Sequence, residues 1–406
     1  MAAGTLAAVR ATAGRWAAWC AVALGFSIPI SVAFDNILLA ATAATWLAAG
    51  AWRDTWHAAR NNAVSLAALT LFSLLVLGTL YGERAPGDAT AYLVKYMDLL
   101  FIPVFALLFR DAALRRRALH ALAASLVLVL VISYLVAAGM PAVRPMFDST
   151  GNPVAFKHAL THGILMAYGA FLFAELALAE TSRVRRTLWT VASLAAAANV
   201  LLMVESRTGY VVLAVLAVYL GYGWLRWRGM AITMAVTATA VVVLALIPGP
   251  FQQRLGLAPD GPSQSRASQW AQISNAERLD MYRTTLAIIE ERPLLGVGTG
   301  GFPRAYADHA RAGGVTASRN PHNEYLLIAA QLGFGGLAVL IGLFWMHWRL
   351  APRLASPLEH HLARGLLLTI GIGCLFNSLL LDHTEGLLFA WLTGLLFGGL
   401  KSRLGG

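Results

Sequence analysis

The residues best suited to chemistry lie in the run Asn-Pro-His-Asn-Glu-Tyr at 320–325, where a polar stretch meets the apolar segment Leu326 to Trp345. An imidazole changes its charge near neutral pH, and at a membrane surface it can move a proton on or off a substrate that lies in lipid. His322 is therefore a candidate general base. The alternative is an interfacial histidine that caps the next helix or bonds a neighbour.

Three arginines are candidates for binding an anion at the same surface. Arg207 stands at the outer junction of two apolar segments, where a guanidinium is costly to desolvate unless an anion meets it. Arg278 and Arg283 lie on a predicted helix of a long loop. A guanidinium fork binds phosphate oxygens in pairs, which favours Arg over Lys for a diphosphate ligand. Salt bridges to nearby carboxylates, a snorkelling side chain or a solvated helix face are the alternatives.

Other polar residues are weaker candidates. Asp382 and Glu385 are placed to orient a catalytic group or hold an arginine, and Lys95 and Asp98 are spaced to pair with each other. The run Gly296 to Gly301 satisfies G-x-G-x-x-G, but it follows a predicted helix rather than a strand, which excludes a nucleotide-binding fold. We favour a flexible turn there over a nest of backbone N–H groups that approaches a phosphate.

No metal site or disulfide is predicted. Four further histidines fall near the outer surface without paired-ligand spacing, and the outer loops hold no Asp-x-Asp. They are His158, His162, His309 and His383. Cys20 and Cys374 both fall inside apolar segments, so no disulfide framework is implied.

The elements that must position these residues are membrane helices. Hydrophobic residues make up 58% of the 406 residues and charged residues 13%, against roughly 25% charged residues in soluble domains. Hydropathy predicts an all-α polytopic membrane protein with about twelve spans in a single bundle. The spans are Trp16 to Phe34, Ile37 to Trp52, Val64 to Tyr81, Ala91 to Phe109, Ala118 to Ala138, Ala159 to Ala179, Leu188 to Val204, Tyr210 to Trp227, Met230 to Ile247, Tyr325 to Trp345, Leu362 to Leu381 and Leu387 to Leu400.

The charge distribution predicts the topology. The formal charge of +11 comes from basic residues concentrated in alternate loops, so it follows the positive-inside rule and does not indicate nucleic acid as a partner. Both termini are then cytoplasmic. The chain divides into nine spans over residues 1–248, a periplasmic loop over 249–323 and three spans over 324–406.

The long loop has two predicted parts. Pro250 to Ser274 is rich in Gly, Pro, Ser and Gln and is expected to be mobile. An amphipathic helix then begins at a cap on Ser274 or Asn275 and stops at Pro293. Its apolar face is Leu279, Tyr282, Leu286 and Ile289, and it lies on the bundle or the outer leaflet.

His322-Asn323, nine residues and then Gly333-Phe334-Gly335-Gly336 resemble the H-N-x9-G-x-x-G signature of bacterial O-antigen ligases. Their superfamily also includes O-antigen polymerases and protein O-oligosaccharyltransferases. Ser206-Arg207 at the outer end of a helix, and Arg278 opening the loop helix, extend the resemblance. The sequence departs from the family's R-x3-L pattern, because Val211 stands four residues after Arg207, where the pattern has Leu.

The resemblance implies a GT-C-type glycosyltransferase of the bacterial inner membrane. It would move a glycan from undecaprenyl diphosphate to a hydroxyl of lipid A–core oligosaccharide at the periplasmic face, without metal or cofactor. His322 would act as general base, and Arg207 and Arg278 would neutralise the diphosphate. The remaining substrate-binding candidates are Asn323, Lys157, Arg283, Arg304 and Asp382.

Alternatives from the same and other classes stay open. A polymerase would use a second lipid-linked glycan as acceptor. A protein O-oligosaccharyltransferase often carries a sizeable soluble domain, whereas about six residues follow the last predicted span. A secondary transporter would show internal repeats and ionisable residues near mid-membrane, whereas the polar groups here gather at one outer surface.

Overall fold

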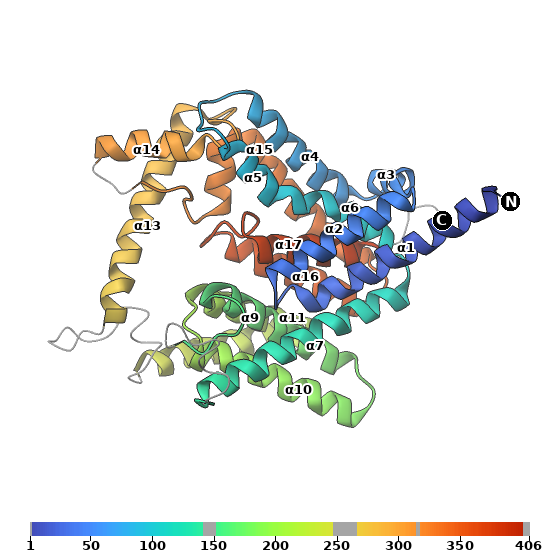
Figure 1. The fold of residues 1–406 in the computed structure, drawn as a ribbon. Helices are drawn as coiled ribbons and strands as arrows, with labels where there is room; N and C mark the ends of the chain where they lie inside the picture. Colours follow the sequence, from blue (N-terminus) through green and yellow to red (C-terminus); the bar gives the residue numbers. More distant parts are fainter. Residues whose placement is uncertain (1, 141–151, 247–265, 314–316, 401–406) are drawn as a thin grey trace.

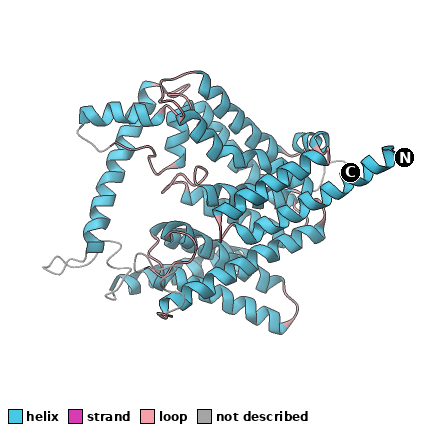
Figure 2. Cartoon of the chain, viewed as in Figure 1, coloured by secondary structure: helices cyan, strands magenta, loops and turns pink. Residues whose placement is uncertain are grey.

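A computed structural model of the chain describes residues 2–140, 152–246, 266–313 and 317–400. This part is all-helical, with 81% helix and no strand, as the sequence predicts (Figure 2). The helices are α1 (Ala2–Ser27), α2 (Val32–Ala48), α3 (Trp52–Arg60), α4 (Ala63–Leu77), η1 (Gly78–Leu80), α5 (Asp88–Tyr96), η2 (Met97–Leu100), α6 (Phe101–Leu108), α7 (Ala112–Ala137), α9 (Ala159–Ala179), α10 (Arg183–Ala198), η3 (Asn199–Met203), α11 (Arg207–Leu246), α13 (Arg266–Glu291), α14 (Phe302–Gly313), α15 (Glu324–Leu350), η4 (Ala351–Arg353), α16 (Pro357–Gly373) and α17 (His383–Phe397).

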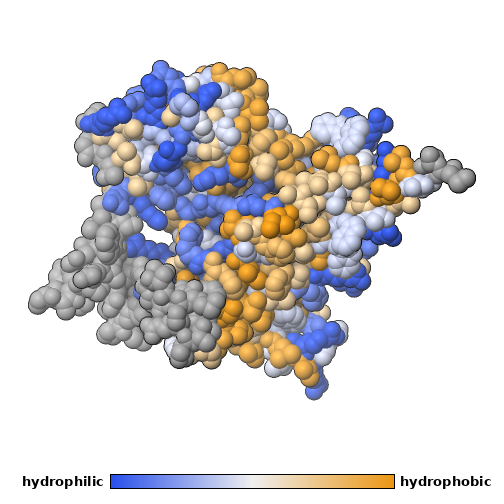
Figure 3. Space-filling view, viewed as in Figure 1, coloured by the Kyte–Doolittle hydropathy of each residue, from blue (hydrophilic) through white to orange (hydrophobic). Residues whose placement is uncertain are grey.

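Seven helical stretches of the described residues are long and apolar enough to cross a membrane, or eight if α2 and α3 count as one broken span. Hydrophobic side chains gather over the bundle, while hydrophilic ones gather around α14 (Figure 3). The chain is therefore a multi-pass membrane protein. Helices α16 and α17 have 17 and 15 residues. They are shorter than the 18 residues required of a candidate span, so they are not counted among these stretches.

The predicted second span, Ile37 to Trp52, is broken. Helix α2 ends at Ala48, and α3 turns away from it by 102°. The Trp52 and Trp56 side chains on α3 are exposed, and the Arg53 guanidinium stacks on the Trp52 ring at 4.8 Å. Tryptophan and arginine together are typical of a helix that lies along a membrane interface.

The predicted eighth and ninth spans are the two halves of α11, which is not one continuous helix. Leu225 and Arg226 are non-helical, and Arg226 has a φ of 55°. Beyond them the second half packs against the first: a Cβ added to Gly221 would lie 2.6 Å from the Thr233 side chain. The two halves therefore fold back on each other, which supports two segments rather than one.

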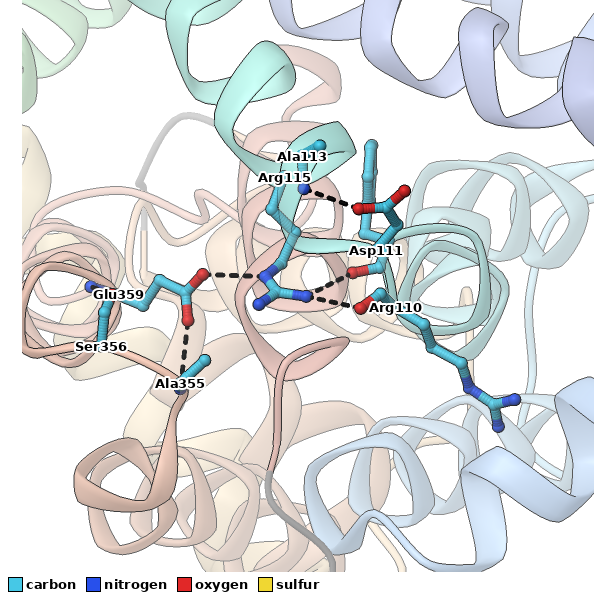
Figure 4. Close-up of polar contacts among 8 residues, drawn as sticks. Arg110, Asp111, Ala113, Arg115, Ala355, Ser356 and Glu359 are labelled. Atoms are coloured by element: carbon cyan, nitrogen blue, oxygen red, sulfur yellow. Dashed lines mark hydrogen bonds and ion pairs between the residues drawn. The ribbon is translucent and has the colours of Figure 1, made fainter.

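A buried ion pair ties α7 to α16 (Figure 4). Arg115 is 3% exposed, and its Nε donates to the Glu359 carboxylate at 2.8 Å. Its Nη1 donates to the carbonyls of Phe109 and Arg110 at 3.0 and 2.8 Å. The second carboxylate oxygen of Glu359 accepts the Ala355 N–H at 3.1 Å. Both charges are thus hydrogen-bonded, as burial of an ion pair requires.

The loop helix exists but starts earlier than predicted. Helix α13 begins at Arg266 rather than at Ser274 or Asn275, and it ends at Glu291, before Pro293 as expected. It stands at one side of the bundle, with α14 crossing its far end (Figure 1). The predicted mobile part of the loop lies mostly outside the described residues.

The predicted apolar face of α13 is only partly correct. Ile289 is buried, but Leu279 and Leu286 are 49% and 47% exposed. Near its C-terminal end Ile288 is also buried, where α13 meets α14 and α15. The helix therefore packs through one end and leaves part of its apolar stripe uncovered, which periodicity alone does not reveal.

Candidate active site

His322 sits in an unusual backbone conformation before α15. Its φ is 53°, in the left-handed region that a residue with a Cβ rarely adopts. Its N–H donates to the Asn320 side-chain oxygen at 2.8 Å, and the same oxygen accepts the Ser378 hydroxyl at 2.7 Å. These bonds hold a strained residue in place, which is common at functional sites.

The imidazole of His322 is oriented by a chain of side chains. Nδ1 lies 2.8 Å from the Asn377 Oδ1, and the Asn377 Nδ2 donates to Asp382 at 3.0 Å. Since Oδ1 only accepts, Nδ1 carries the ring hydrogen, and a neutral ring then keeps an unprotonated Nε2. Burial raises the pKa of Asp382, while Lys95, His158 and His322 oppose the rise.

Asn323, rather than His322, caps the following helix. Its Oδ1 accepts the Leu326 N–H at 3.0 Å, and its Nδ2 donates to the Leu375 carbonyl at 3.1 Å. The interpretation of His322 as a helix cap is therefore wrong. Asn323 instead anchors α15 to the connection between α16 and α17.

Buried contacts fix the floor of the site. The Glu324 carboxylate is fully buried and accepts the Tyr96 hydroxyl at 2.5 Å and the Leu380 N–H at 3.0 Å. The Tyr282 hydroxyl of α13 donates to the Leu375 carbonyl at 3.0 Å and lies 3.4 Å from the His322 carbonyl. Helices α5, α13 and α15 and the loop before α17 thus meet around His322.

Arg207 is placed by an irregular turn that the sequence did not predict. The predicted seventh span ends in a π-helix, η3, and α11 begins at Arg207 after the Ser206 hydroxyl accepts the Gly209 N–H at 3.1 Å. A Cβ on Gly163 of α9 would lie 2.4 Å from the Ser206 Cβ, so the backbones are in close contact. Single π-turns are frequent at functional sites.

A buried polar network supports this turn. The His162 Nε2 lies 3.1 Å from the Asn199 Oδ1, and the Asn199 Nδ2 donates to the Ser133 hydroxyl at 2.8 Å. All three side chains are fully buried. The network joins α7, α9 and η3 directly behind the turn that carries Arg207.

Arg207 and Arg278 lie within electrostatic range of each other. Their guanidinium charges lie near enough to repel each other, although they come from α11 and α13. Arg278 also stands four residues before Tyr282, on the same face of the helix that contacts the His322 loop. Two mutually repelling cations are suited to a multivalent anion.

The other predicted cationic residues are dispersed. Arg283 is exposed and lies 3.8 Å from Asp280, and Arg304 pairs with Glu83 at 2.7 Å on the outside of α5. The Lys157 ammonium is buried without a hydrogen-bond partner in the described part of the chain. Burial lowers its pKa, and the nearby carboxylates Asp35 and Glu385 oppose this.

Lys95 and Asp98 do not pair with each other as expected. Lys95 lies near Asp382, and Asp98 lies near His383 and Asp35. A group of three or more metal-binding side chains does not occur among the described residues.

The glycine-rich run does not form a phosphate nest. The N–H groups of Val297 and Gly298 donate to the carbonyls of Ala330 and Gln331 at 2.8 and 2.9 Å, where α15 is broken at Gly333. The other four N–H groups are also hydrogen-bonded: Gly296 to Arg292, Thr299 to Gly78, Gly300 to Gln331 and Gly301 to Gly298. The run thus packs between η1 and α15, and all six of its N–H groups are hydrogen-bonded. We call this packed segment, residues 296–301, the wedge.

The sequence matches a known protein family over part of its length. Residues 191–341 match the family model described as O-antigen ligase. This match supports a relationship of that segment to the O-antigen ligase-type superfamily. No curated protein matches it.

The matched segment contains His322, Arg207 and Arg278. Asn377 and Asp382, which orient His322, lie beyond it. Asn377 was missed by sequence reasoning because its contact with His322 spans 55 residues and no local pattern marks it.

Proposed function

We propose that the protein transfers a glycan from undecaprenyl diphosphate to a hydroxyl of lipid A–core oligosaccharide, at the periplasmic face of the bacterial inner membrane. The O-antigen ligase family match supports ligase- or polymerase-type glycan transfer. The observation that carries the proposal is the polar chain that orients His322 through Asn377, and the electrostatic repulsion between Arg207 and Arg278 supports an anion site.

In the proposed reaction His322 is the general base. Its Nε2 takes the proton of the acceptor hydroxyl as the hydroxyl oxygen attacks the anomeric carbon of the donor. A new C–O bond forms while the bond from that carbon to the diphosphate oxygen breaks. Attack opposite the leaving group inverts the anomeric centre.

Arg207 and Arg278 supply the second half of the catalysis. Negative charge grows on the diphosphate as it leaves, and a bound anion between the two guanidinium groups would relieve their repulsion. These cations take the place that a divalent metal has in many phosphate-handling sites, so we propose that the transfer is metal-independent.

We further propose a GT-C-type architecture with twelve membrane crossings and cytoplasmic termini. Residues 1–248 supply nine crossings, 249–323 form the periplasmic loop and 324–406 supply three. Asn323, Lys157, Arg283, Arg304 and Asp382 complete the substrate-binding set, with Asp382 acting on substrate through Asn377 and His322.

The test is transfer by the purified protein from undecaprenyl-diphosphate glycan to lipid A–core, with and without EDTA. His322→Ala is expected to lower the rate about 10²–10⁴-fold, the usual value of a general base. Arg207→Ala and Arg278→Ala should also reduce transfer, and EDTA should have no effect.

Exposed residues provide matched controls. His120→Ala and Arg311→Ala remove the same kinds of side chain from α7 and α14, outside the proposed site, and should leave the rate unchanged. Undiminished transfer by folded His322→Ala would remove the proposed base. Transfer onto a second lipid-linked glycan, or onto a protein hydroxyl, would favour a polymerase or a protein O-oligosaccharyltransferase instead.

A further inference from the structure

An open polar cavity lies beside α5, separate from the polar chain that orients His322. Its volume is about 710 Å³, within the usual range of about 300–1,000 Å³ for small-ligand sites. The segment from Thr79 to Leu93 forms most of its wall, and Arg304 of α14 completes it. The charged residues that line it are Glu83, Arg84 and Arg304.

The cavity and the His322 loop flank the same helix. Thr90 and Leu93 of α5 line the cavity. Asp88 of α5 instead forms an ion pair with Arg319, and the Tyr92 hydroxyl donates to the Arg319 carbonyl at 2.5 Å. Arg319 lies three residues before His322, so α5 separates the cavity from the loop that carries the proposed base.

The cavity has an excess of positive charge held in a fixed place. The Arg84 guanidinium donates to backbone carbonyls of Tyr81, Gly82 and Thr79. These bonds fix its position but do not neutralise it, because a carbonyl carries no net charge. The three charged groups, two arginines and one glutamate, therefore leave one positive charge uncompensated.

The ion pair in the cavity is weak enough to exchange for a ligand. Arg304 and Glu83 lie 2.7 Å apart, but their side chains are 53% and 75% exposed. Exposed pairs of this kind contribute little to stability. A ligand anion can therefore replace Glu83 as the partner of Arg304, and a guanidinium prefers the planar or forked oxygens of carboxylate and phosphate.

We propose that this cavity binds an acidic sugar, one carrying a phosphate or a carboxylate, from one of the two glycan substrates. The inference rests on the proposed function, which brings glycans to the protein. The negative charge of the bound sugar is inferred from the positive charge that lines the cavity. The sugar belongs to either the donor or the acceptor, since both present saccharide near the reacting centre.

Binding is tested on the purified full-length protein by calorimetric titration with mannose 6-phosphate, glucuronic acid and neutral methyl glucoside. The two acidic sugars should bind more tightly than the neutral one. Arg304→Ala should weaken their binding about tenfold, as expected for loss of a charge-assisted hydrogen bond. Glu83→Gln should tighten it, because it removes the competing carboxylate.

Arg304→Ala and Glu83→Gln should change the affinity for acidic sugars in opposite directions, which makes the test specific. Arg311→Ala is the matched control, because Arg311 is also on α14 in an exposed pair, with Asp308 at 3.0 Å, and does not line the cavity. Equal binding of neutral and acidic sugars, or weaker binding in Glu83→Gln, would overturn the proposal.

Transfer kinetics identify the source of the sugar. In Arg304→Ala the KM should rise for one substrate only, with kcat retained, and removal of acidic groups from that substrate should abolish the difference. Binding that follows the predicted signs in a protein without transfer activity would leave the cavity assigned and the proposed function refuted. Normal transfer without acidic-sugar binding would refute the proposed role of the cavity and leave the proposed function standing.

Discussion

The chemistry of His322 depends on which ring nitrogen carries the hydrogen. The contact of Nδ1 with the Asn377 Oδ1 at 2.8 Å selects the tautomer in which Nε2 is the acceptor. Asp382 then fixes the Asn377 amide through its Nδ2. Asn377 and Asp382 are therefore positioning residues, and their removal should affect catalysis without removing the base.

Asn377→Leu tests this role. The variant lacks the acceptor for Nδ1, so the ring can adopt the wrong tautomer and orientation. We expect kcat to fall about 10–100-fold, the usual cost of losing a residue that orients a catalytic or ligating histidine, with little change in KM. Asn377→Gln, which keeps an amide, should recover part of the rate. Equal rates for wild type and the folded leucine variant would contradict the positioning role.

The raised pKa of Asp382 predicts a feature of the pH dependence. Burial makes Asp382 take up a proton at a higher pH than an ordinary aspartic acid. As pH falls, protonation of Asp382 should weaken its hold on the Asn377 amide, so the rate should drop. In Asp382→Asn this protonation is absent, so the acid limb of kcat against pH should be less steep. An unchanged slope in this variant would show that Asp382 does not titrate with activity.

Among the elements, the glycine-rich connection between α13 and α14 has a structural function. It lies between η1 and the break in α15, where the Phe334 N–H donates to the Pro293 carbonyl at 2.7 Å. Several of its glycines have positive φ, including Gly298 at 83°. This wedge sets the point at which α13 leaves the bundle, and therefore the position of Arg278.

Gly298→Ala should loosen the wedge. Its added Cβ would lie 2.2 Å from the Tyr81 carbonyl oxygen, and its positive φ alone costs about 1–3 kcal/mol for an L-residue. We expect a lower Tm in detergent and faster hydrogen exchange in α13. Gly342→Ala in α15 is the control, because nothing lies within 4 Å of the added methyl group. Equal stability of the two variants would argue against the wedge.

At the scale of the whole molecule, buried charge joins helices that are far apart in the sequence. Arg115 on α7 and Glu359 on α16 are separated by 244 residues, and both side chains are less than 10% exposed. Such a pair adds little stability compared with apolar packing, but removing one partner strands the other charge.

Glu359→Ala should therefore lower the free energy of unfolding by about 3–5 kcal/mol, because Arg115 stays buried without a counter-charge. The measurement is thermal unfolding in detergent. Arg185→Ala is the control: it breaks a pair with Glu180 at 3.2 Å in which the arginine side chain is exposed, so the loss of stability should be small. A similar Tm for both variants would mean that Arg115 finds water or another partner.

The sequence by itself determined the properties that depend on short stretches of chain. Apolar composition and run length predicted a helical membrane protein, Pro293 predicted the end of α13, and the polar run at 320–325 marked the loop that the structure builds into a hydrogen-bonded site. These follow from local transfer free energies and backbone preferences, which do not require knowledge of the fold.

Only the tertiary structure decided which distant groups meet. It paired His322 with Asn377, set Arg207 and Arg278 within electrostatic range of each other, and occupied the N–H groups of the run 296–301 with oxygen atoms of Arg292, Gly298, α15 and η1. It also placed the break in α11 and the π-turn before Arg207. Hydrogen-bond partners and like-charge contacts depend on how helices pack, and packing is set by the whole chain rather than by any window of it.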